Sequence, residues 1–404
     1  MNIRLYTLKE ELTLHLREKV LPFWMNRMVD HEHGGFYGWA DNNGKINKIA
    51  PKAAVMNTRI LWTFSAAYRM FQDNKYLEMA DRSFQYIIDH FVDNEYGGIY
   101  WMLDHQANPI ESKKQIYAEA FAIYSLSEYY KSTGNKQALN LAIEIFHLIE
   151  KYSSDFKQNG YFEAYSRDWK ILDDLRLSDK DMNEKKTMNT HLHILEAYSN
   201  FLSVRDDDQT KECLVNLIDL FINRFINPVN HHLILFFDEY WNPRSNKLSY
   251  GHDIEASWLL TEAAEITGSK LLIEECRLHS TKMAETILKN GTASDGSIYN
   301  EVKEDKMLDD DRHWWPQAEG MVGFLNAYQH TGDEIYVEVL LKLWEFIKKY
   351  MIHPVSGEWY FRVNNRYEPA PDEEFAGPWK APYHNGRMCM EMIRRIDELH
   401  KGGR

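Results

Sequence analysis

Apolar residues recur along this chain at intervals of three and four positions, the spacing that places them on one face of a helix. The pattern predicts twelve helices, over residues 5–27, 54–72, 75–92, 115–132, 135–152, 187–204, 208–226, 252–267, 270–289, 314–331, 334–350 and 384–399. They come in pairs joined by short polar segments such as FQDNKY, KSTGNK, TGSK and HTGDE. Connections this short make the two helices of a pair antiparallel neighbours.

A second pattern, glycine followed by alternating aromatic residues, recurs between the pairs. It reads GGFYGWAD at 34–41, GGIYWMLD at 97–104, GYFEAYSRD at 160–168, GSIYNEV at 296–302 and SGEWYFRV at 356–363. Alternation of this kind is typical of short strands, so we expect a β-hairpin arm on each helix pair.

Six such units can form an open solenoid or close into a ring. Neither end has an obviously polar capping repeat, and the last stretch, NGRMCMEMIRRIDEL, is apolar on one face. Closure buries both ends. We therefore predict an all-α fold, an (α/α)6 barrel of six helical hairpins with the β-hairpin arms on one face. No linker or low-complexity stretch divides the chain, so residues 1–404 are expected to form a single domain.

Composition narrows the possible partners. The net charge of −14 disfavours nucleic acid and anionic membranes, because both require a basic surface. Aromatic residues make up 14% of the chain, an informative excess; a core can use such rings, and sugar-binding clefts also use them as stacking platforms. Core packing is still the more common use of these rings.

Three features bear on the location of the protein. Cys213, Cys276 and Cys389 are odd in number and far apart, which favours a reducing compartment. The N-terminal stretch is charged throughout and offers no signal peptide, and no run of about 18 apolar residues could span a membrane. We expect a cytoplasmic protein, either a monomer or a weak homodimer.

The helix predicted at 187–204 carries two histidines in NTHLHILEAY. Helical spacing places Asn189 and His193 on one face and turns His191 away from it. Taken alone, a histidine beside an apolar stripe is usually a core residue with satisfied hydrogen bonds.

The segment GHDIEASWLL places His252 and Glu255 three residues apart, on one helical face. A carboxylate in that position can hydrogen-bond the imidazole and fix its tautomer. The pair could also be half of a metal site, but the chain has neither HExxH nor paired Glu-x-x-His motifs, so we expect no metal.

Two further segments carry candidate residues. In RHWWPQAEG, Trp315 and Glu319 share a helical face, and one of the two adjacent tryptophans is expected to face a cavity. In GPWKAPYHNGRM, His384 begins the last helix after a proline-stiffened loop that contains Trp379.

Other motifs of catalysis do not occur. The chain has no GxxxxGK[ST], GxGxxG or GxSxG motif, so a nucleotide cofactor and a serine nucleophile lack support. Several histidines with several tryptophans fit proton transfer on a neutral polyhydroxy substrate. We expect a small carbohydrate as partner and no cofactor.

The four segments MNTHLHILEAY, GHDIEASWLL, HWWPQAE and GPWKAPYHN, in this order, resemble the N-acylglucosamine 2-epimerase superfamily, most closely its cellobiose 2-epimerase branch. The resemblance implies an (α/α)6 barrel that needs no metal. It also implies that His252 and His384 act as acid and base, with His193 as a third pocket histidine and Glu255 as the carboxylate supporting His252. The substrate-binding residues that follow from it are Arg59, Tyr117, Asn189, Trp315 and Trp379, to which we add Glu319.

The activity implied is inversion of C2 in the reducing-end glucose of β-1,4-linked disaccharides, through ring opening and a cis-enediolate. The first alternative is an aldose–ketose isomerase or 2-epimerase acting on mannose or another monosaccharide. An N-acylglucosamine epimerase would be expected to use a nucleotide as activator. A glycoside hydrolase would need two carboxylates, for which Glu255 and Glu319 could be nominated. A non-enzymatic sugar-binding protein would not exchange the C2 proton.

Overall fold

The computed structural model describes residues 3–303 and 306–401, and all twelve predicted helices are present in this part of the chain. The inner helices are α3 (Ala54–Phe71), α5 (Ile116–Thr133), α7 (Met188–Leu202), α9 (Tyr250–Thr267), α11 (Trp314–Thr331) and α13 (His384–Lys401). The outer helices are α1 (Ile3–His15), which a π-helical turn joins to α2 (Leu21–Arg27), then α4 (Asn74–Tyr86), α6 (Lys136–Tyr152), α8 (Asp208–Leu220), α10 (Lys270–Thr286) and α12 (Glu334–Phe346).

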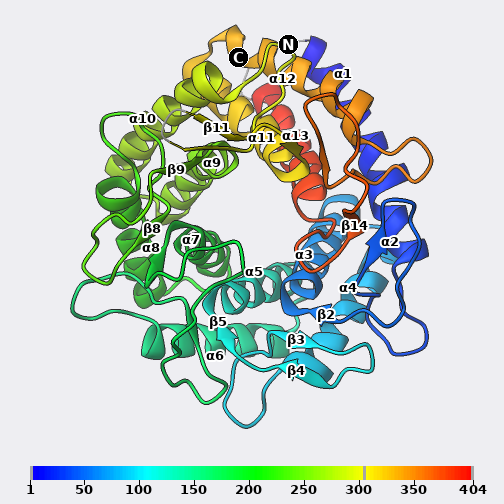
Figure 1. Cartoon of the computed structure of the whole chain (residues 1–404), viewed down its shortest axis with the longest axis vertical. Coiled ribbons are helices and arrows are strands. Elements are labelled where there is room, and N and C mark those ends of the chain that lie inside the picture. The colour runs from blue at the N-terminus through cyan, green and yellow to red at the C-terminus, as the bar shows by residue number, and fades with distance from the viewer. Residues whose placement is uncertain (1–2, 304–305, 402–404) are drawn as a thin grey trace.

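The inner helices form a closed ring. Each packs against the next in chain order, and α13 returns to pack against α3. Figure 1 shows this ring seen from one end, with the two termini side by side where α1 lies against α13. The predicted (α/α)6 barrel is therefore confirmed.

The joints between paired helices explain the recurring TGN, TGS and TGD segments. Gly134 ends α5 in the left-handed region at φ +72°, and Asn135 then caps α6 by accepting hydrogen bonds from two backbone N–H groups. Gly268 with Ser269 and Gly332 with Asp333 repeat the arrangement. One residue thus ends the inner helix and the next begins the outer one.

Short strands lie at one end of the ring. They are β1 (Ala40–Asp41), β2 (Lys52–Ala53), β3 (Met102–Leu103), β4 (Pro109–Glu111), β5 (Lys114–Gln115), β6 (Ala164–Tyr165), β7 (Lys186–Thr187), β8 (Phe236–Phe237), β9 (Lys247–Ser249), β10 (Glu301–Lys303), β11 (Lys306–Asp309), β12 (Arg312–His313), β13 (Arg362–Val363) and β14 (Glu374–Ala376). Among the named strands, β3–β4 and β10–β11 are local hairpins, and single antiparallel bridges such as Val92 with Ile99 and Ser154 with Tyr161 close further local loops at the glycine-aromatic segments. The other pairs join the segment before an inner helix to the segment after the next outer helix, as Lys52 opposite Leu103 does. The pair β1–β14 closes the ring.

Buried lysines fix the same segments. In four units, the lysine before an inner helix reaches a carboxylate that follows an outer helix: Lys52 to Asp30 at 2.7 Å, Lys114 to Asp93 at 3.0 Å, Lys186 to Asp155 at 2.8 Å and Lys380 to Glu358 at 3.0 Å. The four lysine side chains are inaccessible to solvent. A buried charge requires such a partner, so each pair restrains the backbone leading into an inner helix.

The fourth residue of several inner helices anchors the glycine-aromatic segment. His191 accepts from the N–H of Tyr161 at 2.9 Å, and Gln317 accepts from that of Ile298 at 2.8 Å. Each also bonds the carbonyl four residues before it. His191 is therefore a structural residue, buried behind the face that carries His193.

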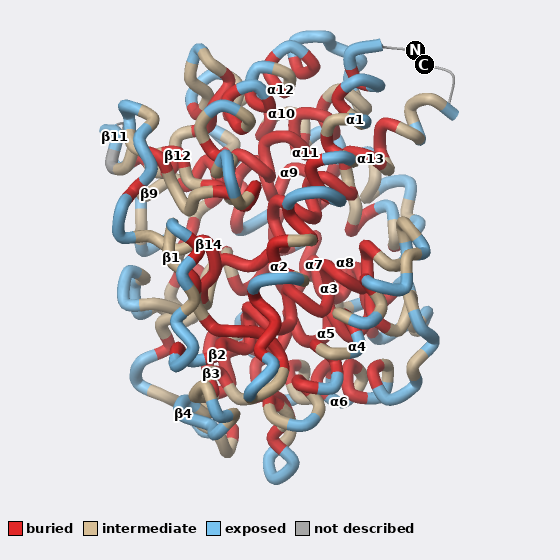
Figure 2. Tube along the Cα trace, turned by 90° about the vertical axis from the view of Figure 1, so that its right-hand side faces the viewer, coloured by how far each residue is buried: buried red, intermediate tan, exposed pale blue. Residues whose placement is uncertain are grey.

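The buried residues lie mainly in the helices that form the ring. Figure 2 shows the buried residues concentrated along the inner helices and the strands gathered toward one side of the molecule. Within the described residues, none of the helices has the length and apolar character needed to cross a bilayer.

Candidate active site

A cavity of about 370 Å³ lies at the N-terminal ends of the inner helices, on the side that carries the strands. Its walls bring together residues from every inner helix and three loops: Arg59, Tyr117, Leu177, Ser178, Asp179, Lys180, Asp181, Asn189, His193, His252, Glu255, Trp314, Trp315, Phe361, Trp379 and His384. All the predicted site residues except Glu319 line it.

Three imidazoles in this cavity are anchored through Nδ1. His193 bonds Glu196 at 2.9 Å, and His384 bonds Glu319 at 2.6 Å. His252 bonds the hydroxyl of Ser249 at 2.8 Å. With Nδ1 engaged in each ring, Nε2 is the nitrogen that can act on a molecule in the cavity.

Burial keeps these rings neutral. It lowers the pKa of His252 to about 3, with further repulsion from the neighbouring His193 and His384. Burial also holds the pKa of His384 well below its usual range, and the guanidinium of Arg59 adds to the effect. A neutral imidazole is the form that can accept a proton, so the site is prepared for general-base chemistry near neutral pH.

Arg387 lies behind the histidines and joins their carboxylate partners. Its Nη2 donates to Glu255 and Glu319, at 2.7 Å each, and its Nη1 donates to Glu196 and to the hydroxyl of Tyr383. The Arg387 side chain is almost fully buried. One guanidinium therefore connects the His193–Glu196 and His384–Glu319 pairs.

The carboxylates of this network differ in proton affinity. Burial would raise the pKa of Glu196, but Arg387 and His193 lower it to about 2. Burial and the neighbouring Glu319 raise the pKa of Glu255 well above its usual range. Burial also raises the pKa of Glu319, although Arg387 opposes this effect. With one guanidinium for three carboxyl groups, the higher proton affinity lies in the Glu255–Glu319 pair.

Two predictions need correction here. Glu255 does not support His252: its contact is with Arg387, and the partner of His252 is Ser249. The three-residue spacing places both side chains on one face, but closure of the ring places the guanidinium of Arg387 within hydrogen-bond distance of the Glu255 carboxylate. Glu319, predicted to bind substrate, lies behind His384 and also accepts from the indole of Trp258 at 3.0 Å.

Arg59 and Tyr117 form one wall of the cavity. The guanidinium donates to the Tyr117 hydroxyl at 2.8 Å and to the backbone carbonyl of Trp379 at 2.7 Å. It also lies over the ring of Phe121, 4.5 Å from the centroid. These contacts hold a permanent positive charge at the edge of the cavity.

Aromatic rings and one amide complete the walls. Trp315 lies against His252, with ring centroids 4.6 Å apart, while Trp314 packs on Phe361 at 4.4 Å. Both tryptophans reach the cavity, although only one was expected to. The amide oxygen of Asn189 is buried and has no partner among the described residues, so it can accept from a bound hydroxyl.

Glu255, Glu319 and His384 offer ligand atoms that lie within 4.8 Å of one another, a spacing that a metal ion could use. Here the cation among them is Arg387, because its Nη2 bonds both carboxylates. The positive charge that such a donor set attracts is thus supplied by the chain itself.

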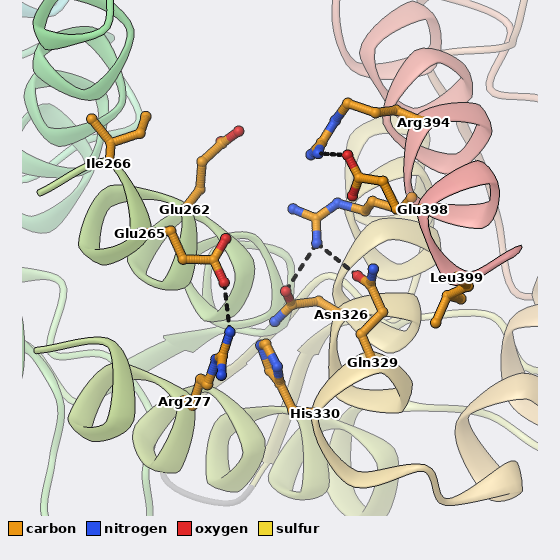
Figure 3. A pocket seen from close by; sticks show the side chains of 11 residues that line it. Glu262, Glu265, Ile266, Arg277, Asn326, Gln329, His330, Arg394, Glu398 and Leu399 are labelled. Carbon is orange, nitrogen blue, oxygen red and sulfur yellow. Dashed lines mark hydrogen bonds and ion pairs between the residues drawn. The ribbon is translucent and has the colours of Figure 1, made fainter. Parts of the chain in front are cut away.

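A larger cavity of about 690 Å³ lies at the opposite end of the barrel, between the C-terminal parts of α9, α11 and α13. Figure 3 shows its charged side chains turned toward each other, with Arg277 on Glu265 at 2.9 Å and Arg394 on Glu398 at 2.8 Å. None of the predicted site residues is there. The smaller cavity, which contains His193, His252 and His384, is therefore the candidate active site.

The sequence patterns do not identify three residues that hold the cavity histidines and their partners. Ser249, Glu196 and Arg387 were all present in or beside the quoted segments but were not nominated. Arg387 had a usable signal, since it stands on the apolar face of the last helix, where a charge requires buried partners. The loop residues 177–181 carried no comparable pattern.

The family model for N-acylglucosamine 2-epimerase (GlcNAc 2-epimerase) matches residues 35–386. A cellobiose 2-epimerase of Bacteroides fragilis is 46% identical over 96% of this chain and 98% of its own. One from Dictyoglomus turgidum is 39% identical over 97% and 100% of the two chains. The solved structure of the Bacillus thermoamylovorans cellobiose 2-epimerase superposes with a TM-score of 0.93, at 39% identity over 96% of this chain and 100% of that one.

More distant similarity is also found. A D-mannose isomerase of Marinomonas mediterranea is 24% identical over 96% of this chain and 98% of its own. A family 76 α-mannanase of Bacteroides thetaiotaomicron has the same fold, with a TM-score of 0.65 at 9% identity over 97% of each chain.

Proposed function

Because the chain belongs to the N-acylglucosamine 2-epimerase family, we propose that it inverts C2 of the reducing-end glucose in β-1,4-linked disaccharides, converting cellobiose to glucosyl-mannose and lactose to epilactose. The chain is a carbohydrate 2-epimerase, an enzyme of the isomerase class. The relatives with the higher identities are named for cellobiose, which supports a disaccharide as substrate.

The observation that carries the proposal is the set of neutral imidazoles that face one cavity through Nε2. Opening of the sugar ring exposes an aldehyde, which acidifies the proton on C2. One histidine of the His252–His384 pair removes that proton and leaves a cis-enediolate. The other histidine of the pair returns a proton to the opposite face of C2, which gives the epimer, and ring closure completes the reaction. His193 contacts the sugar as the third histidine.

The negative charge of the enediolate requires stabilisation. Arg59 supplies a fixed cation at the cavity wall. The inner helices add to it, because all of them direct their N-terminal ends, which carry partial positive charge, toward this side of the barrel.

The remaining residues hold the sugar. Trp315 and Trp379 offer apolar ring faces for the disaccharide, and Tyr117 and Asn189 offer polar groups for its hydroxyls. We assign no metal or organic cofactor to the reaction. We also propose that the enzyme is cytoplasmic, since all three cysteines are free thiols, and that it is a monomer or a weak homodimer.

The carboxylates do not favour hydrolysis. Glu255 and Glu319 bond the same nitrogen of Arg387, so they lie side by side instead of facing each other across a sugar bond.

Product analysis tests the proposal. Purified, EDTA-treated enzyme is incubated separately with cellobiose, lactose and mannose, and the products are identified by NMR. Glucosyl-mannose from cellobiose is the expected result. Glucosyl-fructose would instead indicate an aldose–ketose isomerase, free glucose a hydrolase, and turnover of mannose alone a monosaccharide enzyme.

A further inference from the structure

The three cavity histidines are not held alike. His193 and His384 each face a carboxylate through Nδ1, whereas His252 faces the hydroxyl of Ser249. The chemistry of these partners determines which ring nitrogen carries the hydrogen of the neutral imidazole.

A carboxylate in an ion-pair network accepts hydrogen bonds, so it requires a hydrogen on the nitrogen that faces it. Glu196 and Glu319 both accept from Arg387. His193 and His384 must therefore carry Nδ1–H, and their Nε2 atoms present lone pairs to the cavity. In this form both rings are bases.

Ser249 is in a different situation. It is the residue before α9, where a serine usually caps the helix, yet its side chain caps no backbone N–H. Thr187, in the same place before α7, does cap its helix by accepting from the N–H of Thr190. The Ser249 hydroxyl is thus available for the side chain of His252, one helical turn further on.

The direction of this hydrogen bond follows from burial. Ser249 is 2% exposed, and its hydroxyl hydrogen has no acceptor among the described residues other than His252 Nδ1. If Nδ1 donated instead, that hydrogen would be buried without a partner, at a cost of about 1–3 kcal/mol. The hydroxyl therefore donates to Nδ1, and the hydrogen of neutral His252 resides on Nε2.

We propose that Ser249 is a positioning residue that makes His252 a neutral N–H donor toward the sugar, in contrast to the base His384. The inference rests on the proposed function and decides which histidine takes the first proton. The C2–H bond breaks and its proton binds Nε2 of His384. The electron pair forms the C1=C2 bond, and the carbonyl pair moves to O1, where the N–H of His252 donates a hydrogen bond. As the carbonyl re-forms, the C1=C2 pair takes this hydrogen from Nε2 of His252 onto the opposite face of C2. His384 releases its proton to solvent and His252 regains one from it, which restores both neutral rings. A neutral imidazole is a suitable donor to such an oxygen.

The tautomer is measured directly by ¹⁵N NMR of protein labelled at histidine, at neutral pH and without substrate. The His252 signals are assigned by their loss in His252→Asn. In the wild type we expect the hydrogen on Nε2 for His252 and on Nδ1 for His384. A wild-type His252 with its hydrogen on Nδ1 would overturn the proposal without any variant being needed.

Variants of Ser249 add a kinetic reading. Ser249→Ala should shift His252 toward the Nδ1–H tautomer and lower kcat by about 10-fold, less than the 10²–10⁴-fold typical of losing a whole acid or base, with KM nearly unchanged. Ser249→Thr keeps the hydroxyl, so it should show the wild-type tautomer of His252 and the wild-type kcat. Ser257→Ala on the same helix, whose hydroxyl bonds only the backbone of Ile254 within the described chain, is the matched control and should change neither. A Ser249→Ala protein with wild-type tautomer and kcat would contradict the proposal.

The two measurements separate this inference from the proposed function. The tautomer is observed whether or not the protein turns over cellobiose. Absence of epimerisation with Nε2–H on His252 would reject the function alone, and epimerisation with Nδ1–H would reject the role of Ser249 alone.

Discussion

At the scale of single residues, the site depends on histidines that are anchored at one nitrogen and exposed to the cavity at the other. Nδ1 of His384 is fixed by Glu319, which is itself held by Arg387 and Trp258. Each link restrains the next, so side-chain contacts place the reactive nitrogen.

Removal of either reacting imidazole should abolish turnover and spare the fold. We expect His252→Ala and His384→Ala to lower kcat by about 10³-fold, within the range for loss of a general acid or base. Both side chains lie at the cavity, so truncation leaves the barrel core intact. Steady-state kinetics with far-UV circular dichroism provides the check, and a folded variant that keeps most of its activity would refute the assignment.

The pH dependence of activity should reflect the lowered histidine pKa values. The base must be neutral, and a pKa below the ordinary value of 6.5 keeps it neutral as the pH falls through that value. We expect kcat/KM to stay nearly level from about pH 7 to pH 5. An acid limb centred near pH 6.5 in the kcat/KM profile would show that the imidazoles titrate as solvated groups.

Residue types and spacing predicted most of the cavity wall but not its supporting contacts. Asn189 and His193 could be paired from one helix, because helical periodicity is local. Arg387 and Glu196 are 191 positions apart, and only closure of the ring brings them together. For the same reason Glu255 was assigned to its sequence neighbour His252 instead of to Arg387.

At the scale of elements, the helices could be predicted from the sequence, but the pairing of the strands could not. The helix bounds could be predicted because apolar periodicity, glycine ends and polar caps all lie within a few residues of each other. The partner of a two-residue strand lies across a helix pair, as Leu103 does for Lys52. Alternating aromatics indicated strands but carried no information about which segment they would join.

In two units, different residue types stand at the fourth position of the inner helix and hold the glycine-aromatic segment in the same way. His191 and Gln317 make the same two backbone contacts. We predict that His191→Gln preserves kcat, because the side chain faces away from the cavity. A large loss of activity with retained fold would show that His191 has a role beyond anchoring.

The same substitution should change stability with pH. Burial lowers the pKa of His191 to about 3 in the folded state, against 6.5 when unfolded. The unfolded chain therefore binds more protons below pH 6.5, and the wild type loses stability as the pH falls toward 3. His191→Gln should lose less over that range in thermal unfolding, whereas His191→Leu should be destabilised by about 1–3 kcal/mol at pH 7. Parallel pH profiles for wild type and His191→Gln would contradict the shift.

At the scale of the molecule, the ring makes the ends of the chain neighbours. α1 packs on α13, α13 packs on α3, and β1 pairs with β14, so the first and last units are in direct contact. An open solenoid would have two distinct ends. A closed ring has a seam that could lie between any two units.

A circular permutant tests this equivalence. The native ends are joined by a flexible linker, and new ends are opened in the joint between α7 and α8 near residues 203–207, at the end of α7 away from the cavity. We expect a cooperative unfolding transition and activity within about 10-fold of the wild type, since exposed joints tolerate such cuts. A permutant opened inside β7, beside the cavity, is the contrasting control and should lose activity. An unfolded permutant at the α7–α8 joint would show that the units are not interchangeable.

The most direct test of the account is the fate of the C2 hydrogen. Cellobiose is incubated in D₂O with EDTA-treated enzyme and followed by ¹H and ²H NMR, with His384→Ala run in parallel. Chemistry through an enediolate predicts glucosyl-mannose carrying deuterium at C2, with no exchange in the variant. Glucosyl-mannose that retains hydrogen at C2 throughout, or exchange that persists without His384, would contradict it.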